Sequence, residues 1–227
     1  MRYYPVCLDI KDRPCLVVGG GQVGTRKVGN LLKCGARVTV VSPEVSNELT
    51  ALAEQGKIIV KARGYRSSDL ETAFMVIGAT NDQTLNQRIH DEAERAGRLV
   101  NIADQPVLCN FVLPSIISQG DLIIAISTSG RSPAFAKYLK EQLRDQFGPE
   151  YGRFLDLMGA IRERLLAAEH APEAHKPLFE GLIRSGLLEM IRTGNGTAID
   201  ALLDAVLGPG FTYAQLIEPK NRKPRKS

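Results

Sequence analysis

Three glycines near the start of the chain have the spacing of a phosphate-binding turn. Gly19, Gly21 and Gly24 form a G-x-G-x-x-G pattern after the apolar run Leu16–Val18. In such a turn the first glycine permits a tight bend, the second lets a pyrophosphate approach, and the third lets the next helix pack closely. A glycine-rich turn that binds nothing is the alternative. We predict a dinucleotide site at the helix start, formed by Gly19, Gly20, Gly21, Gln22, Val23 and Gly24.

Asp104 is the strongest candidate for a proton-transferring group. It follows the short apolar stretch Leu99–Val100, at the edge where the nicotinamide side of a bound dinucleotide should lie. A dehydrogenase that removes hydrogen from a carbon framework needs a base as well as a hydride acceptor. An Asx-turn in the segment Asp104-Gln-Pro106 explains the same residue equally well. The sequence therefore leaves a catalytic role and a turn role open.

Polar residues also follow the other predicted strands. A typical NAD site has Asp or Glu after the second strand, but this chain has Ser42 there, with Glu44 two residues later. Both could bind a ribose, and no arginine stands nearby to bind a 2′-phosphate, so we predict NAD rather than NADP. Asn81 or Asp82 could also cap the next helix, which is compatible with a cofactor role. The predicted cofactor contacts beyond the glycine turn are Ser42, Pro43, Glu44, Thr80, Asn81, Asp82 and Asn101.

A second glycine-containing loop spans residues 127–133 and precedes a predicted helix. Its four hydroxyls, its arginine and the N–H groups of the helix start could bind an anion. An ordinary capped helix, with Ser132 as N-cap and Pro133 as first residue, is the common alternative. The predicted substrate contacts in this loop are Ser127, Thr128, Ser129, Gly130, Arg131 and Ser132.

The elements that would position these residues alternate between strands and helices. The apolar and β-branched runs predict strands at Leu16–Val18, Arg37–Val41, Lys57–Ala62, Phe74–Ala79 and Leu99–Val100. Helices are predicted at Gln22–Lys33, Glu44–Gln55 and Gln83–Ala96. The segment Ser42-Pro43-Glu44 is expected to break the second strand. The βαβαβ order predicts an α/β fold with a Rossmann-like parallel sheet.

The pattern changes after Pro106. Two apolar stretches, Asn110–Ile117 and Asp121–Ser127, flank a Gly-containing turn and predict an antiparallel hairpin. A helix is predicted at Ala134–Phe147, with the apolar residues 135, 139 and 143 on one face. The chain from Tyr151 to about residue 217 is predicted to be helical and punctuated by prolines and glycines, Pro172 and Pro177 among them.

Composition and charge exclude several classes of protein. The chain of 227 residues is 44% hydrophobic and 24% charged, as in globular proteins. No apolar run approaches the roughly 20 residues of a membrane span, and the N-terminus lacks an apolar signal core, which predicts a cytoplasmic protein without a membrane partner. The last eight residues contain five Lys or Arg while the rest is nearly neutral, which argues against nucleic acid as a partner.

The cysteines and histidines give no clear metal-ligand spacing. The cysteines, predicted to be mostly buried and reduced, are Cys7, Cys15, Cys34 and Cys109. His90 lies in a charged helical stretch, and His170 and His175 lie in a polar stretch expected to form a loop. Surface positions are expected for all three histidines, and a metal pair of the last two is the alternative.

Six motifs recur in one order along roughly the first 147 residues. They are Val17–Lys27, Gly78–Asp82, Asn86–Arg88, Asn101–Asp104, Phe111–Ile117 and Ser127–Pro133. Together they resemble the precorrin-2 dehydrogenase family, whose module in siroheme synthases also acts as sirohydrochlorin ferrochelatase. The residues after 147 are similar to the family only in being helical.

The resemblance implies an activity and a site. NAD⁺ would take hydride from precorrin-2 to give sirohydrochlorin, and Fe²⁺ would then be inserted to give siroheme. The family's catalytic aspartate falls on Asp104, and Arg131 suits a substrate with many carboxylates. Thr128 stands where some members have a regulatory serine, and it too could be phosphorylated. A dehydrogenase without chelatase activity and a non-catalytic NAD-sensing module are the alternative functions.

The resemblance also implies the organisation of the chain. An NAD-binding Rossmann domain would span 1–113 and a dimerisation segment of hairpin and helix 114–147. A small all-helical C-terminal domain would span 148–217, and a disordered basic tail 218–227. Strands within 110–127 would exchange between two copies, which predicts a homodimer.

Overall fold

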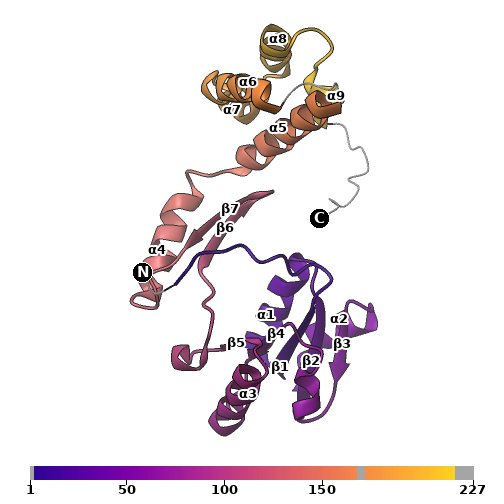
Figure 1. Cartoon of the computed structure of the whole chain (residues 1–227), viewed down its shortest axis with the longest axis vertical. Helices are drawn as coiled ribbons and strands as arrows, with labels where there is room; N and C mark the ends of the chain where they lie inside the picture. Colours follow the sequence, from indigo (N-terminus) through magenta and orange to yellow (C-terminus); the bar gives the residue numbers. More distant parts are fainter. Residues whose placement is uncertain (1–2, 168–171, 218–227) are drawn as a thin grey trace. The chain divides into compact units, whose positions relative to one another are not determined.

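The structure of the chain is a computed structural model that describes residues 3–167 and 172–217 (Figure 1). It divides into two compact units, Met1–Leu113 and Pro114–Ser227, and each is described by itself. The predicted tail 218–227 and His170 lie outside the described residues. Among the described helices, none is both long and apolar enough to cross a membrane.

The first unit is a parallel sheet with helices on both faces (Figure 1). Its strands are β1 (Pro14–Gly20), β2 (Arg37–Val45), β3 (Ile58–Lys61), β4 (Met75–Gly78) and β5 (Leu99–Ile102). They lie in the order β3-β2-β1-β4-β5. In sheets of this order, ligands bind at the carboxyl ends of the strands, where the order reverses between β1 and β4. The predicted α/β class and Rossmann-like sheet are confirmed.

Two apolar cores hold the helices against the sheet. The helices are α1 (Gln22–Lys33), α2 (Asn47–Glu54) and α3 (Gln83–Arg95), with the short 3-10 turns η1 (Ser67–Leu70) and η2 (Pro106–Leu108). Val17 belongs to the same core as Val28 of α1 and Leu49 of α2. Val18 belongs to the core that contains Ile89 of α3. Because neighbouring side chains of a strand point to opposite faces, α1 and α2 cover one face and α3 the other.

The strand β2 is longer than its sequence pattern predicts. The segment Ser42-Pro43-Glu44 does not break the strand, which continues to Val45. Its pairing with β1 shifts there, because Val18 lies opposite Val41 whereas Gly20 lies opposite Val45. The additional residues of β2 pair irregularly with β1 beside the glycine turn. This pairing keeps the chain extended where a break is predicted.

Several further boundaries differ from the prediction, and two of them lie near the carboxyl ends of strands. The helix α2 begins at Asn47 rather than Glu44, because Ser46 is its N-cap and accepts a hydrogen bond from the Leu49 N–H. The strand β5 runs through Ile102 rather than ending at Val100. Both differences arise where strand pairing extends beyond the apolar run that marks the strand in the sequence.

The second unit begins with the predicted antiparallel hairpin. Its strands are β6 (Ser115–Gln119) and β7 (Leu122–Ile126). The first strand is shorter than predicted, because Asn110 bonds to Val100 of β5 and Pro114 lies between the two segments. The helix α4 (Pro133–Arg144) follows, with Ser132 as N-cap. Its buried residue is Ala136, whereas Phe135, predicted for the apolar face, is exposed.

The rest of the second unit is helical, as predicted. The helices are α5 (Pro149–Ala167), α6 (Pro172–Arg184), α7 (Leu187–Thr193), α8 (Gly196–Leu207) and α9 (Tyr213–Ile217). They share a core that includes Leu157 of α5, Leu182 of α6 and Leu203 of α8. Pro177 lies inside α6 instead of interrupting it.

Some predicted side-chain positions are wrong. Cys7 and Cys34 are exposed, although Cys15 is buried and Cys109 partly buried. Cys34 is exposed because it is the C-cap of α1, at the surface end of that helix. His175 is only 5% exposed, because α6 continues through this stretch and places the residue on a helix rather than in a loop.

Candidate functional site

The three glycines of the turn between β1 and α1 have different surroundings. Gly19 has a φ of +113°, and a Cβ on it would overlap the carbonyl oxygen of Ala79. A Cβ on Gly24 would overlap the carbonyl oxygen of Gly19. In contrast, a Cβ on Gly21 would have no atom within 4 Å. The outer two glycines therefore allow close packing, and the central one faces open space, where a pyrophosphate would lie.

The helix α1 begins without a side-chain cap. Its N-cap is Gly21, which makes no side-chain hydrogen bond, whereas Ser46 caps α2, Asp82 caps α3 and Ser132 caps α4. The first N–H groups of α1 therefore lack the partner that these other helices have, and they can bind an anion. Together with the open space at Gly21, this fits the pyrophosphate of a dinucleotide.

A buried asparagine anchors the polar turn after β4. Asn86 is 2% exposed; its Nδ2 donates to the Thr80 carbonyl at 3.0 Å, and its Oδ1 accepts from the Thr80 hydroxyl at 2.9 Å. Asp82 accepts from the Leu85 N–H at 3.0 Å as the cap of α3. The contact between Gly19 and Ala79 places this turn beside the glycine turn. The structure therefore brings two of the predicted cofactor segments together.

The end of β2 also lies beside the glycine turn. A Cβ on Gly20 would overlap the carbonyl oxygen of Glu44, and the Ser46 N–H donates to the Gly20 carbonyl at 2.9 Å. Glu44 and Pro43 are exposed, but Ser42 is buried. In this segment Glu44 therefore has the exposed polar side chain that could hydrogen-bond a ribose.

Asp104 occupies an exposed turn directly after β5. Its φ is +59°, a left-handed conformation that is uncommon outside glycine and that Asp and Asn adopt most readily. The Ala103 N–H donates to the Gly78 carbonyl at 2.8 Å, which joins the turn to the end of β4. Asn101 is buried, and its side-chain amide donates to the Phe111 carbonyl at 3.1 Å.

A lysine that the sequence patterns do not single out interacts with Asp104. Lys27 lies on α1 and is half-buried. Burial and the neighbouring Arg26 lower the pKa of its ammonium group, whereas the negative charge of Asp104 raises it. A basic group thus lies within electrostatic reach of the candidate base.

The loop 127–133 belongs to the second unit. The hydroxyl oxygen of Thr128 accepts from the Ser132 N–H at 3.2 Å, and that of Ser127 accepts from the Ser129 N–H at 3.2 Å. Because these hydroxyls act as acceptors here, their own protons remain for a ligand. Arg131 is exposed. The loop is thus capped as the alternative interpretation expects, and it still presents donors.

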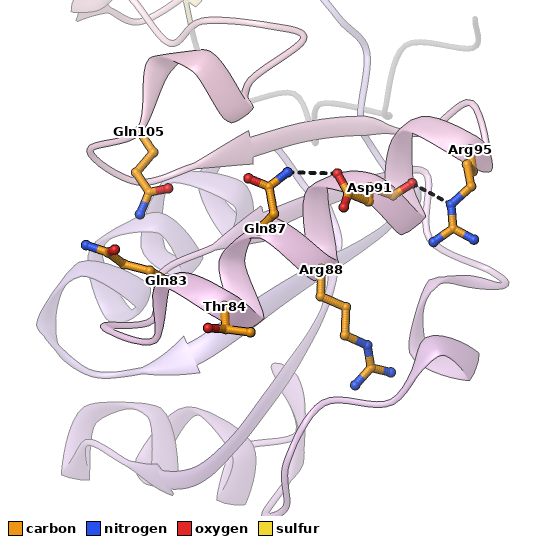
Figure 2. A pocket seen from close by; sticks show the side chains of 7 residues that line it. All are labelled: Gln83, Thr84, Gln87, Arg88, Asp91, Arg95 and Gln105. Atoms are coloured by element: carbon orange, nitrogen blue, oxygen red, sulfur yellow. Dashed lines mark hydrogen bonds between the residues drawn. The ribbon is translucent and has the colours of Figure 1, made fainter.

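A polar hollow of about 590 Å³ runs along the outer side of α3 (Figure 2). It is lined by Gln83, Thr84, Gln87, Arg88, Asp91, Arg95 and Gln105. The Gln87 amide donates to the Asp91 carboxylate at 2.8 Å, and Arg95 donates to the Asp91 carbonyl at 3.1 Å. None of the predicted site residues lines this hollow, and its charged groups are paired with their neighbours. We therefore place the site at the strand ends and not here.

In the part of the chain that the structure describes, no three His, Cys, Asp or Glu side chains gather into a potential metal site.

Comparison with known proteins identifies the class of the first unit and of part of the second. Residues 6–115 match the family described as putative NAD(P)-binding, and residues 119–146 match the family described as sirohaem biosynthesis protein central. The first match covers β1 to β5 with the turns that follow them, and it shows an NAD(P)-binding domain. The second covers most of the hairpin and α4.

Individual relatives agree with these matches. The chain is 37% identical over 207 residues to siroheme synthase 1 of Cronobacter sakazakii, and 34% identical over 215 residues to the siroheme synthase of Nitrosococcus oceani. These alignments take in 91% and 95% of this chain but 44% and 46% of the relatives, so the chain spans less than half their length. The solved structure of SirC, a precorrin-2 dehydrogenase, matches with a TM-score of 0.77 and 30% identity, over 90% of this chain and 99% of that one. The chain therefore belongs to the family of the precorrin-2 dehydrogenases and the N-terminal modules of siroheme synthases.

Proposed function

We propose that this protein oxidises precorrin-2 to sirohydrochlorin with NAD⁺ as hydride acceptor. The observation that carries the proposal is the juxtaposition at one edge of one sheet. An uncapped helix start with open space at Gly21 lies at the end of β1, and Asp104 lies in a left-handed turn after β5. The first arrangement binds the cofactor's phosphates, and the second supplies an exposed base.

The reaction removes two hydrogens from the substrate, one as a hydride and one as a proton. Bound NAD⁺ supplies the carbon that accepts the hydride. We assign the proton to the carboxylate of Asp104, which takes it as the hydride leaves and then releases it to water. Sirohydrochlorin, NADH and one proton result. Because Asp104 is exposed, a large macrocycle can reach its carboxylate.

The other predicted residues would bind the two reactants. The backbone of the glycine turn would hold the pyrophosphate, Glu44 the adenosine ribose, and the turn at Thr80–Asp82 the cofactor near β4. The carboxylate of Glu44 would also repel a 2′-phosphate, which favours NAD over NADP. In the second unit, Arg131 and the hydroxyls of the 127–133 loop would bind the carboxylates of the substrate.

Iron insertion is the second step of the proposal. Fe²⁺ would replace the two pyrrole protons of sirohydrochlorin, giving siroheme and two protons. Asp104 is the group we assign to accept these protons in turn, because the same macrocycle would already lie against it. The relatives named siroheme synthase support this step.

We propose that the hairpin is the contact between two copies of the chain. Ile116 and Ile123, on one face of the hairpin, are 44% and 58% exposed. On α4, the rings of Phe135 and Tyr138 stack with centroids 6.2 Å apart and are also exposed. The other face of the hairpin buries Ile117 within this unit, and the exposed apolar face favours a partner. Light scattering should give twice the chain mass of 24.8 kDa, and a mass equal to that value would contradict the dimer.

Anaerobic incubation with precorrin-2 tests the reaction sequence. With NAD⁺ the absorption spectrum should change to that of sirohydrochlorin, and Fe²⁺ added afterwards should give siroheme. NADP⁺ should support a slower first step because of Glu44. If sirohydrochlorin persists after Fe²⁺ is added, the protein is a dehydrogenase without chelatase activity. If the protein binds NAD⁺ but precorrin-2 does not change, the protein is a non-catalytic NAD sensor.

A further inference from the structure

The outer edge of β5 is hydrogen-bonded by Asn110 and not by a sixth strand. Asn110 donates its N–H to the Val100 carbonyl at 3.1 Å, and its Oδ1 accepts from the Val100 N–H at 2.8 Å. Its Nδ2 donates to the Arg98 carbonyl at 2.8 Å. Asn110 thus makes the hydrogen bonds that a neighbouring strand would make. We call the segment Cys109-Asn110-Phe111 the edge clasp.

The thiol of the edge clasp closes the turn that carries Asp104. The sulfur of Cys109 accepts from the Ile102 N–H at 3.3 Å, and it lies 3.3 Å from the carbonyl oxygens of both Ile102 and Gln105. Because a thiol has one proton, these two carbonyls share it. The Asn101 amide approaches the same sulfur at 3.5 Å while donating to the Phe111 carbonyl. The sulfur therefore bonds to backbone on both sides of Asp104.

These contacts hold a turn that would otherwise relax. Asp104 has its left-handed φ of +59°, a conformation that persists where the surrounding structure fixes it. Burial raises the pKa of the Cys109 thiol, with the Ile102 backbone bond and Lys27 acting in the opposite direction. The sulfur therefore keeps its proton near neutral pH and remains a donor to the two carbonyls.

We propose that Cys109 is a positioning residue for Asp104. Through the backbone of Ile102 and Gln105, its thiol fixes the place of the carboxylate that takes the proton from the substrate. This inference rests on the proposed dehydrogenase function. Cys109 itself needs no contact with substrate or cofactor in this role.

Two variants separate hydrogen bonding from packing at this position. Cys109→Val keeps an apolar side chain of similar size and removes every sulfur contact, and Cys109→Ser restores a donor and an acceptor. We expect Cys109→Val to lower kcat for precorrin-2 oxidation about 10–100-fold, as a displaced catalytic group does, with NAD⁺ affinity unchanged. Cys109→Ser should recover most of this loss. Cys15→Ala, a buried thiol on β1 away from the turn, should lower the unfolding temperature and keep kcat.

The readouts distinguish failure of this inference from failure of the function. Wild-type kcat in Cys109→Val, or an equal loss in the valine and serine variants, would overturn the positioning role. If the wild-type protein leaves precorrin-2 unchanged, the proposed function is wrong. In that case the NMR signals of residues 102–105 still report the position of the turn. Cys109→Val should shift these signals, and Cys109→Ser should restore them. Unshifted Asp104 signals in Cys109→Val would refute the inference.

Discussion

Replacing Asp104 with asparagine is expected to lower kcat for precorrin-2 oxidation by about 10²–10⁴-fold, the usual contribution of a general base. Asparagine adopts the left-handed conformation of this turn as readily as aspartate, but its amide accepts no proton. NAD⁺ binding should be unchanged, because the phosphate site lies at α1. Single-turnover spectra under anaerobic conditions measure the first effect, and titration with NAD⁺ measures the second.

A matched control separates the carboxylate from the backbone. Asp12 also has a positive φ, +58°, and is exposed in a turn far along the chain from Asp104. Alanine at either position adds a similar conformational cost of roughly 1–2 kcal/mol. Asp12→Ala should therefore lose stability as Asp104→Ala does, and only the latter should lose turnover. Near-normal kcat in Asp104→Asn would show that another group is the base.

Replacing Gly21 with aspartate is expected to weaken NAD⁺ binding at least about a hundredfold. The space at Gly21 is open in the protein, so the new side chain fits the fold and fills the place of the pyrophosphate. Its charge adds repulsion of about 4 kcal/mol at 4 Å for an effective dielectric constant near 20. Calorimetric titration measures the affinity, and the unfolding temperature should stay close to that of the wild-type protein.

Two other glycines supply the controls for this variant. Gly29 lies on α1, and a Cβ there would also meet no atom within 4 Å, so Gly29→Asp should bind NAD⁺ normally. Gly24→Ala places its Cβ against the Gly19 carbonyl and should destabilise the unit itself. An unchanged NAD⁺ affinity in Gly21→Asp would show that the pyrophosphate lies elsewhere.

Local sequence signals predict an element well where both its start and its end are marked by characteristic residues. The helix α1 has the predicted bounds, Gln22–Lys33, because a glycine turn precedes it and Gly35 with a positive φ follows it. The end of β2 depends instead on its irregular pairing with β1 near Gly20. That pairing joins residues distant in sequence, so the local pattern around Pro43 predicts a break that the strand does not have. Pro177 within α6 shows the same limit, because packing on neighbouring helices overrides a local breaker.

The sequence predicts which segments form the candidate site. It does not predict the side chains that hold those segments in place. Lys27 and Cys109 act on the Asp104 turn through charge and hydrogen bonds that exist only once α1, β5 and the edge clasp have met. Asn86 could have been found, because it shares a buried helical face with Ile89 and Ala93. A polar residue on an otherwise apolar stripe indicates a buried hydrogen-bonded role.

The edge clasp ends just before the point where the chain passes from one unit to the other. Phe111 is its last residue, and the first unit ends at Leu113. A domain excised after Leu113 would carry every hydrogen bond of the clasp, whereas one excised after Leu108 would lose them all. A domain that ends after Leu113 therefore keeps the glycine turn and the Asp104 turn together with the contacts that hold the latter. A gene fusion or domain exchange made at this junction would transfer both turns, but not the substrate contacts proposed for the 127–133 loop.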